Sequence, residues 1–178
     1  MPTDLKERVQ DITGNCSEFL NDFLNALNAL SKSGKVYSHD FGKLLDRIKT
    51  VSTASDQFFA IQNAPAYAAG LSLGDGNNRQ IYIRSNAITP ATAAKNQQFR
   101  WNAIAQVTIA ELLHHSRSSG TFSDPLLDQA ALSLITGKEL NDARAEMAKK
   151  DYAAGSVGHT LVKTRCKPTN PYGAPPSR

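Results

Sequence analysis

The sequence predicts an α+β domain that is mostly helical, with a small antiparallel β-hairpin beside a central helix. Apolar residues recur at steps of three or four over most of the chain, which is typical of amphipathic helices. The period shortens to two only between residues 66 and 85. A third observation is that residues 92–115 are apolar around much of a helical circumference, as in a buried central helix. A chain of 178 residues can bury a core of its own, so we predict one domain over 1–160 and a basic, Pro-rich tail over 161–178.

The first part of the chain is predicted to be helical. An apolar stripe over residues 5–30 predicts an amphipathic helix that can bend at Gly14. After a turn, Asp40 is placed to cap a second helix over 41–51, because an Asp side chain accepts hydrogen bonds from the free N–H groups of a first turn. Ser55 is placed to cap a short third helix in the same way.

Extended structure follows. Residues 66–73 and 80–85 are predicted strands, and the Gly-, Asp- and Asn-rich segment 74–79 is typical of a hairpin loop. Ile81 and Ile83 alternate with polar or amphipathic neighbours, so their side chains are expected on the buried face of the sheet.

Two helices complete the predicted core. The central helix over 92–115 ends at a Ser- and Gly-rich turn, and Ser123 is then placed as the N-cap of the next helix. Pro125 suits the first turn of that helix, and Gly137 marks its end.

The charge distribution argues against a nucleic-acid-binding domain. The net charge is +4, but from Lys149 onward six basic residues face one acidic residue, so residues 1–148 sum to about −1. We therefore interpret the basic tail as a solvated end; a nucleic-acid-contacting effector that acts through this tail is the less favoured reading. The apolar runs predict no membrane span, and the N-terminal segment does not have the pattern of a signal peptide.

The two cysteines leave two alternatives open. Cys16 and Cys166 lie near opposite ends of the chain and have no metal-binding or redox spacing. They either form one disulfide that ties the C-terminal segment to the first helix, as suits an exported protein, or remain two unpaired thiols.

The segment from 108 to 131, "TIAELLHHSRSSGTFSDPLLDQAA", carries the candidate chemistry. In the zinc-binding pattern H-E-x-x-H, two His residues on one helix face bind the metal and the Glu polarises a water molecule. Here the aligned positions begin with Ala110, followed by Glu111 and His114. Asp124 stands ten residues after His114, at the expected start of the next helix.

This run resembles compact zincin-like metallopeptidase domains, which occur as C-terminal domains of large bacterial surface or Rhs-repeat-type proteins. Their shared pattern is a hairpin, a helix bearing HELLH, a Gly-containing turn and "SD..LA.AA". "AELLHHS...GTFSDPLLDQAA" is similar to it with one substitution, and "NCSEFLNDFL" is similar to the Cys-bearing first helix of such domains. The resemblance is specific over 66–131, weaker over 10–60 and absent from the tail.

The resemblance implies a role for each matching residue. It implies Glu111 as the general base, His114 as a zinc ligand and Asp124 as a third ligand. Ala110 replaces the first ligand, which leaves two protein ligands where a catalytic zinc site has three, so weak or absent zinc binding and loss of peptide hydrolysis are expected. His115 lies about 100° around the helix from His114, so we interpret it as an auxiliary, hydrogen-bonding residue.

Two functions are compatible with this sequence. One, which the resemblance implies, is a metallopeptidase-like toxin or effector domain whose fold is built to hydrolyse peptide or protein substrates but which is inactivated at Ala110 in this chain. The resemblance also implies export, or delivery as part of a larger bacterial surface protein. The alternative is a non-catalytic peptide-binding module, a pseudoenzyme, that captures an extended peptide beside the hairpin. His39 and His159 have no partner at a recognisable ligand spacing and are interpreted as ordinary residues.

Overall fold

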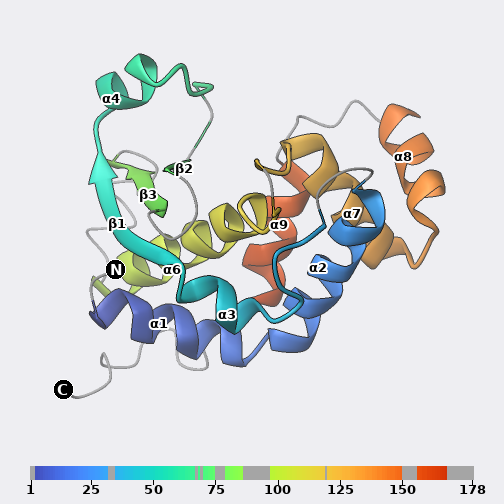
Figure 1. The fold of residues 1–178 in the computed structure, drawn as a ribbon, viewed down its shortest axis with the longest axis horizontal. Helices are drawn as coiled ribbons and strands as arrows, with labels where there is room; N and C mark the ends of the chain where they lie inside the picture. Colours follow the sequence, from blue (N-terminus) through green and yellow to red (C-terminus); the bar gives the residue numbers. More distant parts are fainter. Residues whose placement is uncertain are drawn as a thin grey trace.

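The protein has the predicted α+β fold, with helices predominating and one small sheet. The computed structural model describes residues 3–31, 35–66, 68, 70–74, 79–85, 97–118, 120–149 and 156–167. The elements below lie within these ranges, and the arrangement is shown in Figure 1.

The N-terminal apolar stripe forms two helices instead of one bent helix. α1 (Thr3–Gly14) and α2 (Ser17–Leu30) are separated at Asn15 and Cys16, whose N–H groups donate to the carbonyls of Ile12 and Thr13 in a tight turn. Gly14 ends α1, as expected for a residue with low helix propensity. Both helices turn their apolar face inward, and the stripe residues Val9, Ile12, Leu20, Phe23, Leu24 and Leu27 are fully buried.

The second predicted helix is shorter than the expected range of residues 41–51. Asp40 caps α3 (Phe41–Leu45) as expected, because its Oδ1 accepts from the Gly42 N–H at 2.9 Å. The helix ends at Leu45, however, and Ile48–Ala54 is strand β1. This part of the prediction was wrong because four of the seven strand residues are β-branched and gain a pairing partner in β3, a tertiary contact that outweighs the helical stripe.

The hairpin prediction is confirmed. β2 (Gly70–Leu73) and β3 (Arg79–Arg84) pair antiparallel, and Ile81 and Ile83 are fully buried. β3 also pairs in parallel with β1, so the sheet is mixed, with the order β1-β3-β2. The short helix α4 (Asp56–Ile61) connects into this region, and Ser55 caps it as expected by accepting from the Phe58 N–H.

Four helices follow the hairpin among the described residues. The central helix α6 (Gln97–His114) ends as predicted; its expected start near Thr92 lies outside the described residues. α7 (Asp124–Thr136) starts after Ser123 and ends at Gly137, which adopts the left-handed conformation with φ 65°. α8 (Leu140–Lys149) and α9 (Ser156–Arg165) follow.

Helix α9 belongs to the core and not to a tail. It crosses the domain boundary that we expected after residue 160, and its Leu161 and Val162 are buried. Just beyond it, Cys166 forms a disulfide with Cys16, so the structure decides the question that the sequence left open. The domain therefore extends at least to Cys166.

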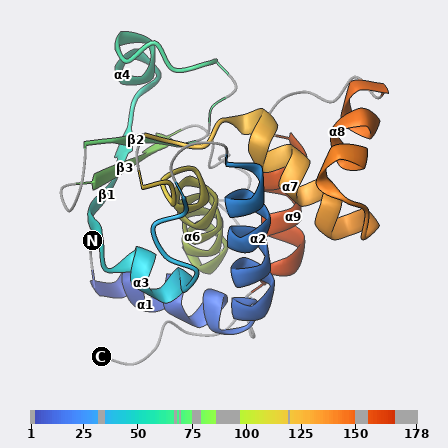
Figure 2. The same ribbon diagram turned by 45° about the vertical axis from the view of Figure 1, so that its right-hand side comes forward.

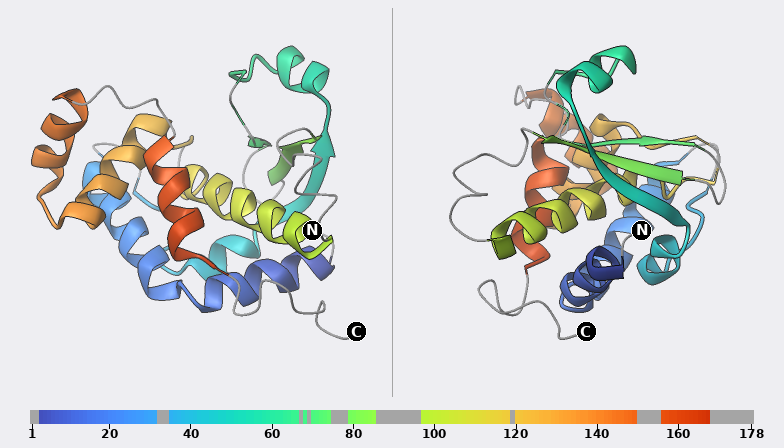
Figure 3. Two further views of the ribbon diagram at one scale, coloured as in Figure 1. Left: turned by 180° about the vertical axis from the view of Figure 1, so that it is seen from behind. Right: turned by 90° about the vertical axis from the view of Figure 1, so that its left-hand side faces the viewer.

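Helix α6 lies between the two halves of the molecule. Figures 1 and 2 show the sheet and α4 on one side, and α2, α7 and α8 on the other. In the left panel of Figure 3, which shows the molecule from behind, α9 crosses close to α6. In the right panel the sheet lies over α6. This arrangement lets the C-terminal end of α6 meet the sheet, α7 and α9.

No described helix is long and apolar enough to cross a membrane.

Candidate metal centre

The last turn of α6 presents a carboxylate and an imidazole toward the same region. Glu111 and His114 are three residues apart, so they share a helix face. Leu112 and Leu113 lie between them and are buried in the core, which fixes the orientation of this turn. Glu111 is itself buried, whereas His114 is half-buried.

Phe122, in the segment that follows α6, makes two hydrogen bonds with His114. The Phe122 N–H donates to the His114 carbonyl at 2.7 Å, and the His114 Nδ1 lies 2.8 Å from the Phe122 carbonyl oxygen. A carbonyl oxygen only accepts, so Nδ1 carries a proton and donates it. This leaves Nε2 of His114 as the nitrogen that can bind a metal ion.

Asp124 reaches that nitrogen from the first residue of α7. Its Oδ1 lies 3.1 Å from the His114 Nε2. The preceding Ser123 occupies the N-cap position but its side chain makes no capping hydrogen bond among the described residues. The structure therefore brings together the three residues that the resemblance implied: Glu111, His114 and Asp124.

A fourth residue, His159, completes the group. Its Nε2 lies 3.3 Å from the His114 Nε2, and the ligand atoms of Glu111, His114 and His159 all lie within 4.8 Å of one another. The sequence interpretation of His159 as an ordinary residue was wrong. The two histidines are 45 residues apart and on different helices, so no local spacing could indicate their meeting.

Strand β2 approaches the group from the sheet side. A Cβ atom built on Gly70 would lie 2.5 Å from the Glu111 Oε1 and 2.7 Å from its Cδ. The backbone of β2 thus lies directly against the Glu111 carboxylate because residue 70 has no side chain. β2 is an edge strand of the described sheet, so one of its edges does not pair with another described strand.

Burial and neighbouring charges shift the proton equilibria of two of these groups strongly. Burial raises the pKa of the Glu111 carboxyl to about 7; the charge of His114 opposes this rise and that of Asp124 adds to it. Burial also lowers the pKa of His159 to about 4, with the positive charge of His114 acting in the same direction. Near neutral pH, His159 is therefore a neutral imidazole, the form that binds metal ions.

The contact between His114 and Asp124 shifts the pKa values of both groups in opposite directions. Burial alone would lower the pKa of His114, but the Asp124 carboxylate, Glu111 and the Phe122 carbonyl together raise it above its usual value. The hydrogen bond from His114 lowers the pKa of Asp124 in turn. A metal ion bound at Nε2 would compete with this hydrogen bond, so metal binding to protonated His114 should release a proton.

Two separations in this cluster are close to the spacing of neighbouring ligand atoms in a tetrahedral metal site, and both include the His114 Nε2. The residues whose ligand atoms all lie within 4.8 Å of one another are Glu111, His114 and His159. With zinc–ligand bonds of about 2.0 Å, neighbouring ligand atoms in a tetrahedron are separated by about 3.3 Å. The His114–His159 separation is 3.3 Å and the His114–Asp124 separation is 3.1 Å. Two imidazoles and a carboxylate are also a ligand set found in catalytic zinc sites.

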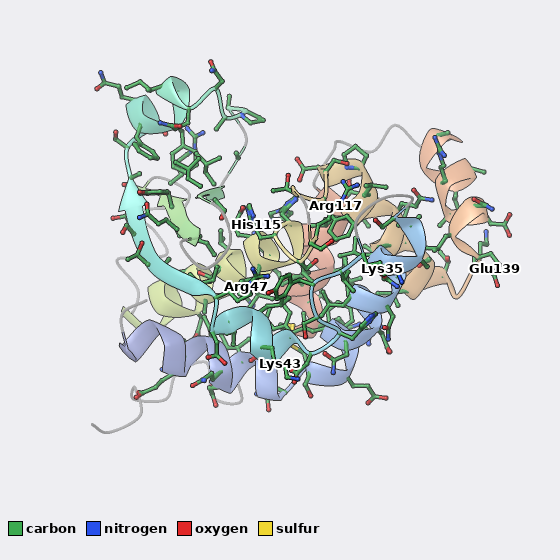
Figure 4. The ribbon with its side chains drawn as sticks, viewed as in Figure 1. Lys35, Lys43, Arg47, His115, Arg117 and Glu139 are labelled. Atoms are coloured by element: carbon green, nitrogen blue, oxygen red, sulfur yellow. A yellow bond between two sulfur atoms is a disulfide. The ribbon has the colours of Figure 1, made fainter. Side chains whose placement is uncertain are left out.

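The other singled-out residues lie outside this group. Ala110 is buried in α6, and His115 is buried at the end of the same helix, where Figure 4 labels it. His39 is exposed and its Nδ1 contacts the Asn25 Oδ1 at 2.6 Å, far along the chain from the cluster.

No family model, curated protein or solved structure matches this chain, so the fold and the geometry of its own residues carry the functional argument.

Proposed function

We propose that the protein is a zinc-dependent hydrolase of peptide bonds, with His114, His159 and Asp124 as metal ligands and Glu111 as the general base. The observation that carries this proposal is the convergence of two imidazole Nε2 atoms 3.3 Å apart with a carboxylate oxygen 3.1 Å from one of them. The expectation of weak zinc binding rested on a count of two protein ligands. His159 supplies a third candidate, so Ala110 does not by itself leave the site incomplete.

Each residue has a definite part in such a site. A zinc ion would lower the pKa of a coordinated water and polarise the substrate carbonyl. Glu111 is positioned by α6 and β2 to accept a proton from the attacking water, and its raised pKa of about 7 is close to the value that suits a general base at neutral pH. The Phe122 carbonyl holds the His114 ring in the ligating tautomer.

A peptide substrate is supported by the position of β2. Extended peptides bind edge strands through main-chain hydrogen bonds. Because Gly70 in β2 lies against Glu111, a peptide aligned on the edge of β2 that pairs with no described strand would pass beside the general base.

Zinc titration of the purified protein tests the proposal directly. We expect stoichiometric zinc binding that releases protons, and chelator-sensitive cleavage of unstructured peptides. His159→Ala should abolish tight binding, whereas His39→Ala, which removes an exposed histidine away from the cluster, should not change it.

A ligand exchange makes the test more specific. Adding Ala110→His to His159→Ala restores the i, i+4 histidine pair on α6, and we expect it to recover zinc binding. If wild-type protein binds no zinc, or if His159→Ala binds it as tightly as wild type, the proposed site is wrong.

The alternative is a peptide-binding module without catalysis, which the substitution at Ala110 favours. It predicts that peptide affinity is insensitive to zinc and to Glu111→Gln, so the same titrations, repeated with a non-cleaved peptide, distinguish the two functions.

A further inference from the structure

Asp128 is a buried acidic residue that the proposed reaction does not use. It lies on α7, and none of its surface is exposed. Burying a carboxylate is costly unless it is hydrogen-bonded, so its position calls for a strong polar partner. That partner lies on the helix that carries His159.

Asp128 caps α9 from outside that helix. Its Oδ1 accepts from the backbone N–H of Gly158 at 2.8 Å. Gly158 is the third residue of α9, and the N–H groups of a first turn have no partner within their own helix. A carboxylate at this point accepts a hydrogen bond from one of these N–H groups. Its negative charge also interacts favourably with the positive N-terminal end of the helix dipole.

The packing of the two helices agrees with this contact. A Cβ on Gly158 would lie 3.2 Å from the Leu127 Cβ and 3.4 Å from the Asp128 Oδ1, so the absence of a side chain lets α9 lie close against α7. Asp124 and Asp128 are four residues apart on α7, hence on one face. One of these carboxylates contacts His114, and the other contacts the residue immediately before His159.

We propose that Asp128 is a positioning residue that sets His159 as a metal ligand by fixing the first turn of α9 on α7. This inference rests on the proposed function, since it assigns His159 to the metal. α9 reaches the cluster from a different part of the chain than His114 and Asp124, and the bond from Gly158 to Asp128 ties the residue immediately before His159 to α7.

Metal affinity is the property to measure. We expect Asp128→Ala to weaken zinc binding by about 10- to 100-fold, the range typical for residues that orient a ligand. Asp128→Asn keeps an oxygen acceptor and should stay within a few-fold of wild type. The matched control is Asp40→Ala: Asp40 makes the same bond, to the Gly42 N–H at 2.9 Å, at the start of α3, so its loss should leave zinc affinity unchanged.

A double-mutant cycle separates positioning from general loss of stability. If Asp128 acts through His159, Asp128→Ala in a His159→Ala background should not weaken zinc binding further. Cobalt(II) in place of zinc gives a second readout, because its visible absorption should change in the same direction in Asp128→Ala and His159→Ala. The proposal would be overturned if Asp128→Ala weakened zinc binding equally in the wild-type and His159→Ala backgrounds. It would also be overturned if Asp128→Ala kept the wild-type zinc affinity and cobalt spectrum.

Asp128→Ser, whose hydroxyl is too short to reach Gly158, is the second variant if Asp128→Ala does not fold, and it carries the same expectations. Failure of the proposed function has a different signature, because then wild-type protein would bind no zinc at all. Failure of the positioning role leaves wild-type binding and its loss in His159→Ala intact.

Discussion

The fold strongly changes the acidity of the Glu111 carboxyl. It is buried against the backbone of β2, and its pKa is raised to about 7. In the unfolded chain the carboxyl would ionise near its ordinary value of 4.5. Between these two values the folded protein holds a proton that the unfolded chain has lost, so the contribution of Glu111 to stability decreases as pH rises.

This difference gives a prediction for the metal-free protein. Glu111→Gln removes the titrating group, so the variant should gain stability relative to wild type as pH rises from 4.5 to 7, with a plateau above that range. The gain should be about 3 kcal/mol, because one pKa unit corresponds to about 1.4 kcal/mol. Urea unfolding in the presence of a chelator, repeated from pH 4.5 to pH 8, measures it.

His159 adds a second pH dependence of stability, which wild type and Glu111→Gln should share. Its pKa is lowered to about 4, so its contribution to stability is lost as pH falls from 6.5 toward 4, and this effect is present in both wild type and Glu111→Gln. A difference between the two proteins that does not depend on pH would contradict the buried, titrating state of Glu111.

Part of the site could be read from residue spacing. Glu111 and His114 lie on one helical turn, and Asp124 follows at the start of the next helix, so the resemblance to a motif of neighbouring residues could select all three. His159 and Asp128 could not be found in this way. Their roles depend on the position of α9 against α6 and α7, and nothing in the sequence around residue 159 encodes that contact by itself.

Among the elements, the packing of β2 on α6 defines the position of Glu111, the proposed general base. The strand can approach Glu111 because Gly70 has no Cβ. A Cβ atom at this position would lie 2.5 Å from the Glu111 Oε1. A side chain at this position must displace either the carboxylate or the strand.

Gly70→Ala should therefore reduce peptide hydrolysis with little change in zinc affinity, since Glu111 is not a proposed ligand. The loss should be on the order of 10²-fold, as for a catalytic group displaced by about 1 Å. Steady-state kinetics beside a zinc titration separate the two effects. Gly14→Ala is the matched control because a Cβ there meets nothing within 4 Å; an equal loss in both variants would count against the contact with Glu111.

The elements that the sequence misidentified are those in which two patterns compete. Residues 41–51 carry a helical stripe, yet the β-branched residues after Leu45 form β1 because β3 offers them a parallel partner. By contrast, Ser55 and Asp40 cap their helices as predicted, because a cap depends only on neighbouring backbone groups.

At the scale of the whole molecule, the disulfide joins the start of α2 to the end of α9. Cys16 and Cys166 are separated by 150 residues and both are buried. Nearby, the Gln106 side chain of α6 donates to the Cys166 carbonyl at 2.9 Å. The helix that carries His159 is therefore anchored at its first turn by Asp128 and just past its end by the disulfide.

Removing this link should destabilise the fold and loosen α9. We expect Cys16→Ser with Cys166→Ser to lower the free energy of unfolding by roughly 2–5 kcal/mol, the usual range for a disulfide that closes a long loop, and to weaken zinc binding as well. Denaturant unfolding and zinc titration of the non-reduced proteins provide both measurements. Reductant should shift wild-type protein toward the variant and leave the variant itself unchanged, and equal unfolding midpoints would argue against a stabilising link.

Local sequence was enough to predict the fold class, the hairpin and the caps at Asp40 and Ser55, because each of these depends on periodicity or on neighbours within one or two turns. The roles of Glu111, His114 and Asp124 came from the resemblance to a motif. The packing of distant segments was needed to show that residues 48–54 form strand β1, that the two cysteines are bonded and that His159 lies beside Glu111 and His114. These features require residues far apart in the chain to meet, and the packing of α9 between α6 and α7 provides the meeting point.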